Sequence, residues 1–277
     1  MMNPSIPQSD PPLSPRLTLP TMYDLPSEDP EEPGLPDEYH VYQPQLLRST
    51  FKPVDIDPEE IFIGTDLNLY YDVRHHQWYK RPDWFAVVGV SRLYDRQDLR
   101  LSYVIWQEQI SPLVVVELLS PGTENEDLGR TIRQPEKPPT KWEVYEGILR
   151  VPYYIVFSRY TNHLEAFRLI GGQYEPVEVT ESGLFIPQLG LSLRLWVGSY
   201  ENIYRLWLRW FSASGELILT PSEQTIQAQQ QAIQAQQQTI QAQQQAIQAQ
   251  QQARLAEEKA ERLAAKLREL NIDPENL

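Results

Sequence analysis

The sequence predicts an α/β or α+β protein, a mixed sheet with one or two helices, followed by a long C-terminal helix. Between residues 60 and 120 several segments have the apolar pattern of strands. Two of them are nearly continuous in apolar residues, as expected for strands covered on both faces. Residues 140–150 have the spacing of a core helix. From residue 222 a strict seven-residue repeat begins, which is typical of a long helix.

Composition divides the chain into three parts. Residues 1–36 are rich in proline and contain scattered acids, so we expect a disordered or extended arm. Residues 37–220 contain the strand and helix patterns and are long enough for one domain. Residues 221–277 carry the repeat, which is rich in Gln and Ala, and we expect a separate helix there.

The first half of the middle part predicts one helix and four strands. Residues 38–50 have apolar residues at helical spacing with Pro44 among them, so we expect a kinked helix or two short pieces. The alternation of apolar residues from Ile61 onward predicts the first strand. Three further strands are predicted at 82–90, 101–108 and 113–120.

The second half of the middle part predicts a helix followed by strands. The helix at 140–150 has its apolar residues on one face. A hairpin is expected around the Gly171–Gly172 turn, and a strand pair at 183–196. The aromatic segment 200–211 fits either a short helix or a strand.

The C-terminal repeat has Ile at four positions, with Thr or Ala directly before each Ile and Ala two residues after it. Positions that alternate in steps of three and four form the seam of a coiled coil, although a seam of alanine buries little surface per heptad. We therefore expect residues 222–270 to make the chain a homodimer or another self-associated form. A glutamine-rich helix without a partner is the alternative.

Charge and composition exclude several classes of protein. The net charge is −14, from 38 acidic and 24 basic residues, so a general electrostatic hold on nucleic acid is not available and any DNA contact needs a cation or a local basic patch. There is no cysteine, which excludes disulfides and thiolate chemistry. No apolar run is long enough to cross a membrane, and we expect a soluble, cytoplasmic protein.

Two of the predicted core strands each contain a carboxylate. Asp83 opens the run "PDWFAVVGV", and Glu117 lies inside "LVVVELLS". An ionised carboxylate in an apolar strand costs free energy unless something positive meets it. Three interpretations follow: the acids lie at strand ends in solvent, they pair with a buried Arg or Lys, or they converge on a divalent cation such as Mg²⁺.

Strand geometry favours the divalent cation. If the two strands are antiparallel neighbours, the start of one lies beside the end of the other, so Asp83 and Glu117 reach one point. A lysine nearby would orient an attacking water or stabilise developing charge. Lys141, at the start of the helix that follows Glu117, is the candidate, and Lys137 is the alternative.

Several motifs occur in a characteristic order in this sequence. They are Pro82-Asp83, "VVVELLSPGT" with Glu117, Asp127, "KWEVY" and "LRVPYYIVF". Together they resemble the Uma2 family of restriction-type endonucleases, once catalogued as a domain of unknown function, within the PD-(D/E)XK nuclease superfamily. The resemblance covers roughly residues 37–220.

The resemblance implies a restriction-endonuclease-like core, a mixed central sheet flanked by helices, and hydrolysis of DNA phosphodiesters that depends on Mg²⁺ or Mn²⁺. It implies that Asp83 and Glu117 bind the metal. The superfamily lysine stands two residues after the second acid, where this chain has Leu119. In this family the lysine lies on the next helix in a K…Y pair, which Lys141 and Tyr145 match.

Two further residues have both a structural and a functional interpretation. Ser120 either belongs to a turn that closes its strand or hydrogen-bonds a metal-bound water or a phosphate. Asp66 either caps a bulge or is a third metal-site acid. The four histidines show no zinc-ligand spacing. A catalytically inactive nuclease-fold scaffold, acting through its coiled-coil tail, is the rival to a DNA endonuclease.

Overall fold

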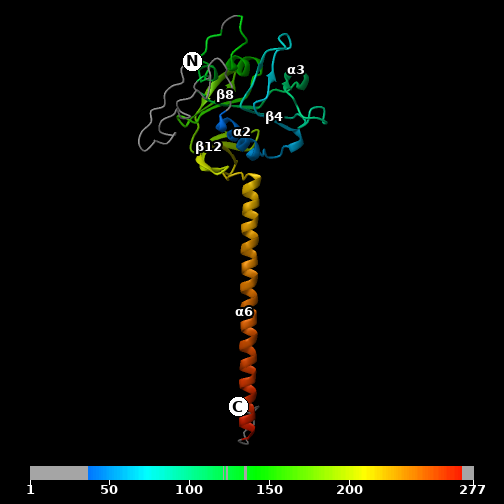
Figure 1. The fold of residues 1–277 in the computed structure, drawn as a ribbon, viewed down its shortest axis with the longest axis vertical. Coiled ribbons are helices and arrows are strands. Elements are labelled where there is room, and N and C mark those ends of the chain that lie inside the picture. The colour runs from blue at the N-terminus through cyan, green and yellow to red at the C-terminus, as the bar shows by residue number, and fades with distance from the viewer. Residues whose placement is uncertain (1–36, 121, 123, 134–135, 270–277) are drawn as a thin grey trace, which may run out of the picture. The chain divides into compact units, whose positions relative to one another are not determined.

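The computed structural model describes residues 37–120, 122, 124–133 and 136–269. The expected N-terminal arm, residues 1–36, lies outside the described residues. The chain divides into two compact units, Met1–Ile218 and Leu219–Leu277. The first unit is mixed α/β and is consistent with a restriction-endonuclease-like fold (Figure 1).

A six-stranded mixed sheet forms the centre of the first unit, in the order β1-β4-β6-β7-β8-β9. Its strands are β1 (Ile61–Gly64), β4 (Trp84–Val88), β6 (Val114–Leu118), β7 (Tyr153–Ser158), β8 (His163–Ile170) and β9 (Gln173–Val177). Neighbours β6 and β7 are parallel, and the other pairs are antiparallel. The predicted hairpin turns at Gly171 and Gly172, both with positive φ, between β8 and β9.

Both faces of this sheet are covered, which explains why its central strands are almost continuously apolar. All residues of β6 and β7 are buried, and side chains alternate between two cores. Trp84 and Val116 belong to the first core, whereas Phe85 and Val115 belong to the second. Residues two positions apart along each strand therefore share a face, which places Asp83 and Glu117 on the side of the second core.

The first core lies between the central sheet, helix α2 (Glu38–Thr50) and an antiparallel sheet. That sheet consists of β10 (Leu184–Ile186), β11 (Leu191–Tyr200) and β12 (Ile203–Ser212). Asp37 caps α2 by accepting a hydrogen bond from the backbone N–H of His40, and Pro44 is accommodated inside the helix. Gln43 joins α2 to β12, because its side chain exchanges two hydrogen bonds with the backbone of Leu208 at 2.7 and 2.9 Å.

The predicted strand at 101–108 is wrong. Only β5 (Tyr103–Val104) is extended, and α3 (Ile105–Glu108) follows directly. With β2 (Leu69–Tyr70) and β3 (Tyr79–Lys80), β5 forms a small third sheet. The alternating run that begins at Ile61 is likewise split between two sheets, because the chain turns at Asp66, where φ is +48°.

The predicted helix at 140–150 consists of α5 (Lys141–Glu143) and the π-helix η2 (Val144–Ile148). A capping box fixes its start: Thr140 accepts from the N–H of Glu143, and the Glu143 carboxylate accepts from the N–H of Thr140. The remaining short helices are η1 (Pro58–Glu60) and α4 (Glu124–Asp127).

The second unit contains helix α6 (Pro221–Glu269), which Figure 1 shows as one continuous helix. None of its described side chains is buried. The heptad isoleucines are about half exposed, at 45–55%. No helix in the described part of the chain is both long and apolar enough to cross a bilayer.

Candidate active site

The two strand carboxylates lie at neighbouring strand ends, as the expected antiparallel pairing requires. Strands β4 and β6 pair with Trp84 opposite Val116, and Asp83 directly precedes β4. The Asp83 carboxylate accepts a hydrogen bond from the backbone N–H of Leu118 at 2.6 Å. Asp83 is therefore fixed to the residue that follows Glu117.

Glu117 is completely buried, with an exposed fraction of 0%. Its Oε1 accepts a hydrogen bond from the Tyr145 hydroxyl at 2.8 Å, and its Oε2 lies 3.1 Å from Nζ of Lys141. The interpretation that this acid lies in solvent is wrong. The second interpretation, pairing with a buried lysine, describes the contact that is present.

Lys141 joins two buried carboxylates. Its Nζ lies 2.7 Å from Oδ1 of Asp127 as well as 3.1 Å from Glu117. The helix start is held in place because the N–H of Lys141 donates to Glu126 at 3.1 Å. Tyr145 follows four residues later and contacts the same glutamate. The K…Y spacing thus brings both side chains to Glu117.

Asp127 is a member of this cluster that the residue patterns alone did not select. It ends α4 and is only 1% exposed. Its position in the sequence, inside a short polar helix with three acids, resembles an ordinary exposed turn. The one available indication was its place among the motifs that resemble the Uma2 family.

Burial raises the pKa of the two strand acids, whereas the neighbouring carboxylates prevail at Lys141. It raises the pKa of Glu117 to about 8, even though the positive charge of Lys141 acts in the opposite direction. Burial also raises the pKa of Asp83, again opposed by Lys141. For Lys141, burial disfavours the charge, but the carboxylates of Asp127 and Glu117 prevail and raise its pKa well above the usual value. Lys141 thus contacts two of the acids and acts on Asp83 through its charge.

The donor set fits a hard divalent cation. Asp83 and Glu117 supply carboxylate oxygens from adjacent strand ends on one face of the sheet, and Mg²⁺ is commonly held by one or two carboxylates together with water. Positive charge there would offset the burial that raises both pKa values. Within the described residues, no group of three or more His, Asp or Glu side chains is placed to hold a metal.

His40 on α2 contacts the end of strand β6, close enough to Asp83 to be affected by its charge. Its Nδ1 lies 2.8 Å from the Asp37 carboxylate and its Nε2 lies 3.1 Å from the carbonyl of Leu118. Burial opposes protonation of the ring, but the hydrogen bond with Asp37 and the charge of Asp83 raise the pKa of His40 to about 9. The backbone N–H of Leu118 therefore donates to Asp83, and its carbonyl accepts from His40. Zinc-ligand spacing gave no indication of this arrangement.

Three other sequence candidates lie outside the carboxylate–lysine cluster formed by Asp83, Glu117, Asp127 and Lys141. Asp66 is 56% exposed and pairs with Arg81 at 2.7 Å. The carbonyl of Ser120 accepts from the N–H of Glu124 at 3.1 Å, so this residue forms the turn into α4. Lys137 is exposed, and its carbonyl accepts from Arg133.

The fold and the cluster define a mixed α/β protein with a buried carboxylate–lysine cluster at the ends of two central strands. A family model named Uma2, described as "Putative restriction endonuclease", matches residues 17–198. The chain belongs to the Uma2 family. A search of curated proteins finds no match to this chain.

Proposed function

We propose that this protein is a DNA endonuclease that depends on Mg²⁺ or Mn²⁺, with Asp83 and Glu117 holding the ion. The observation that carries the proposal is the contact of Glu117 with both Lys141 and Tyr145, beside the strand end that bears Asp83. Membership of the Uma2 family supports a nuclease. A bound divalent cation would supply Lewis-acid activation of water and of a phosphate oxygen.

Three residues around Glu117 have further roles in this proposal. Lys141 is the cation that orients the attacking water or stabilises charge that develops on the phosphate. Asp127 is a positioning residue, since its carboxylate holds Nζ of Lys141 at 2.7 Å. Tyr145 remains protonated, because burial and the charge of Glu117 raise its pKa, and its hydroxyl fixes one oxygen of Glu117.

A catalytically inactive scaffold is the second candidate function. The net charge of −14 opposes contact with DNA, and α6 has no buried side chain among its described residues and offers a long surface to partners. In a scaffold the ion pairs of Lys141 would serve the fold alone. The nuclease is preferred, because Asp83 is a third acid at the same strand ends, which the ion pairs of Lys141 with Glu117 and Asp127 do not require.

The test is cleavage of supercoiled plasmid. We expect the full-length wild type to nick the plasmid with Mg²⁺ or Mn²⁺, to lose this activity in EDTA, and to lose it in Asp83→Asn. Asp66→Asn is the matched control, because Asp66 is an exposed acid paired with Arg81. If wild type and Asp83→Asn are equally inert over a panel of DNA substrates, the scaffold is favoured.

We further propose that helix α6 joins two copies of the chain. Ile226, Ile233, Ile240 and Ile247 are each about half exposed on α6 and recur every seven residues. A second copy of the same helix is the partner that such a regular repeat fits, because both seams have identical spacing. Two associated nuclease domains would suit the cutting of two DNA strands.

Removing the tail tests its role in self-association. We expect the full chain to sediment as a dimer or a higher oligomer and a chain that ends at Thr220 to sediment as a monomer. Ile233→Gln/Ile240→Gln in the full chain should weaken association in the same direction, since both changes remove apolar surface from the helix. An unchanged oligomeric state in the shortened chain would remove the tail from this role.

A further inference from the structure

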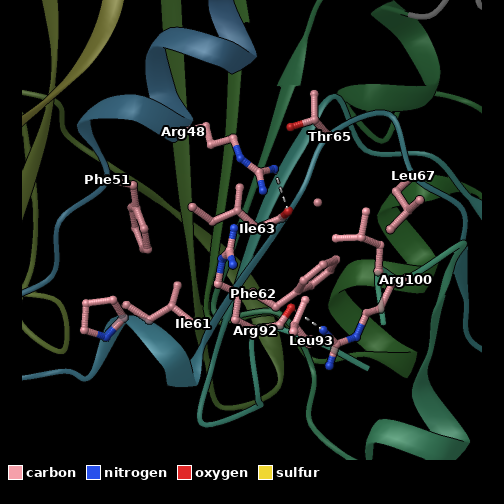
Figure 2. Close-up of a pocket in the computed structure, with 13 residues that line it drawn as sticks. Arg48, Phe51, Ile61, Phe62, Ile63, Thr65, Leu67, Arg92, Leu93 and Arg100 are labelled. Carbon is pink, nitrogen blue, oxygen red and sulfur yellow. Dashed lines mark hydrogen bonds between the residues drawn. The ribbon is translucent and has the colours of Figure 1, made fainter. Parts of the chain in front are cut away.

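A pocket of about 420 Å³ lies along the edge strand β1, apart from the carboxylate–lysine cluster (Figure 2). Neither Asp83 nor Glu117 lines it. Its wall contains three arginines and a group of apolar side chains, and it contains no carboxylate. Such a composition suits an anion that carries an apolar group.

Of the three arginines, one is already neutralised. Arg100 makes two hydrogen bonds with the Glu108 carboxylate, at 2.7 and 3.0 Å, and its guanidinium lies 4.5 Å from the centre of the Phe62 ring. Within the described part of the chain, neither Arg48 nor Arg92 forms an ion pair. No carboxylate of the described residues therefore balances these two positive charges.

These two unbalanced arginines converge. Figure 2 shows the guanidinium groups of Arg48 and Arg92 turned toward one another on one side of the pocket. Burial and the positive charge of Arg92 both lower the pKa of Arg48. Arg48 also donates to the carbonyl of Ile63 at 3.0 Å. This hydrogen bond caps the edge strand β1 and explains the position of Arg48. Edge capping does not explain why Arg92 reaches the same space.

The pocket also has an apolar wall that is partly open. Phe62, Leu67, Leu93 and Leu99 line it, and Leu99 is 74% exposed. Guanidinium groups match the geometry of phosphate oxygens, and bases stack or pack on apolar and aromatic side chains. The pocket volume also lies within the range of small-ligand sites.

We propose that this pocket binds a nucleoside phosphate, with the phosphate between Arg48 and Arg92 and the base against the apolar wall. The nucleotide is either free or part of a DNA strand. The DNA source rests on the proposed function. A DNA strand could reach both sites, because Gly64 in the pocket wall pairs with Phe85, two residues from Asp83. The free nucleotide needs no nuclease activity.

Binding without catalysis tests the proposal on the full chain in EDTA. The probes are a short fluorescein-labelled single-stranded oligonucleotide, followed by anisotropy, and deoxyadenosine 5′-monophosphate, followed by calorimetry. We expect Arg92→Gln to weaken binding about tenfold and Arg48→Gln/Arg92→Gln to weaken it further. For the oligonucleotide, the slope of log affinity against log salt should fall by about 0.7 for each phosphate that the variant no longer neutralises.

Arg96→Gln is the matched control, because Arg96 is exposed in the same loop but does not line the pocket. It should bind like the wild type. Within the described residues, the side chain of Arg92 donates to no backbone carbonyl, unlike that of Arg48. Arg92→Gln should therefore keep the wild-type melting temperature, and a loss of binding in this variant would not reflect unfolding. Arg92→Lys should restore part of the affinity.

Each outcome has one meaning. Oligonucleotide binding that depends on Arg92, without binding of the mononucleotide, assigns the pocket to a DNA strand. Mononucleotide binding that depends on Arg92 assigns it to a free nucleotide. Absence of binding to both probes, or equal binding by wild type and Arg92→Gln, overturns the proposal. Inert plasmid assays combined with Arg92-dependent binding would reject the nuclease and keep this pocket.

Discussion

Glu117→Gln is expected to lower the rate of plasmid cleavage by at least about a hundredfold and, at the same time, to make the stability of the metal-free protein less dependent on pH. The loss of rate follows because the amide keeps the shape of the side chain but removes a charged oxygen ligand. Glu165→Gln is the control, since Glu165 and Glu117 both pair with Val156 across the sheet but Glu165 is partly exposed. It should cleave like the wild type.

The effect on stability follows from the direction of the pKa shift. The pKa of Glu117 is raised from 4.5 to about 8 by burial, so the folded state binds more protons than the unfolded state between these values. The free energy of unfolding therefore falls as pH rises from about 5 to about 8, by roughly 3–5 kcal/mol for this group. Urea titrations at both ends of this range should show the fall in the wild type in EDTA and a smaller fall in Glu117→Gln. An equal fall in both proteins would contradict the assignment.

Lys141→Met is expected to abolish cleavage and to lower the free energy of unfolding by about 3–5 kcal/mol at neutral pH, because it removes the cation shared by two buried carboxylates. The loss should shrink toward pH 5, where protonation neutralises carboxylates whose pKa is raised, and grow as pH rises. Urea denaturation at several pH values measures both quantities.

Lys137→Met separates the two lysines that the sequence offered. Lys137 is exposed, whereas Nζ of Lys141 lies 3.1 Å from Glu117. The Lys137 variant should therefore have the same free energy of unfolding and the same cleavage rate as the wild type. A larger loss of activity in Lys137→Met than in Lys141→Met would transfer the catalytic role to Lys137.

The meeting of Asp83 and Glu117 could be expected from the sequence, with Lys141 as the first candidate for a nearby lysine, whereas Tyr145 came only from the resemblance to the Uma2 family. If two neighbouring strands pair antiparallel, the start of one meets the end of the other, and β4 and β6 pair in this way. Residues four apart on a helix share a face, which brings Lys141 and Tyr145 to the same glutamate. The antiparallel pairing itself was an assumption, because an apolar pattern fits a parallel neighbour equally well, as β6 and β7 show.

Contacts made by polar side chains over long distances in sequence could not be predicted in this way. His40 meets the Leu118 carbonyl across 78 residues, and no local pattern encodes that approach. The same holds for the third sheet: the run around Tyr103 fits a strand or a helix by periodicity, and only its pairing with β2 limits the strand to two residues. Tertiary packing determines both the His40 contact and the length of β5.

The convergence of Asp83 and Glu117 on one divalent ion is tested most directly by anomalous diffraction from crystals soaked in Mn²⁺ at pH 8, close to the raised pKa of Glu117. We predict one anomalous peak bonded to both carboxylates, and none in Asp83→Asn crystals soaked in parallel. Crystals without manganese at this position, in which Lys141 still holds Glu117, would contradict a metal-dependent active site.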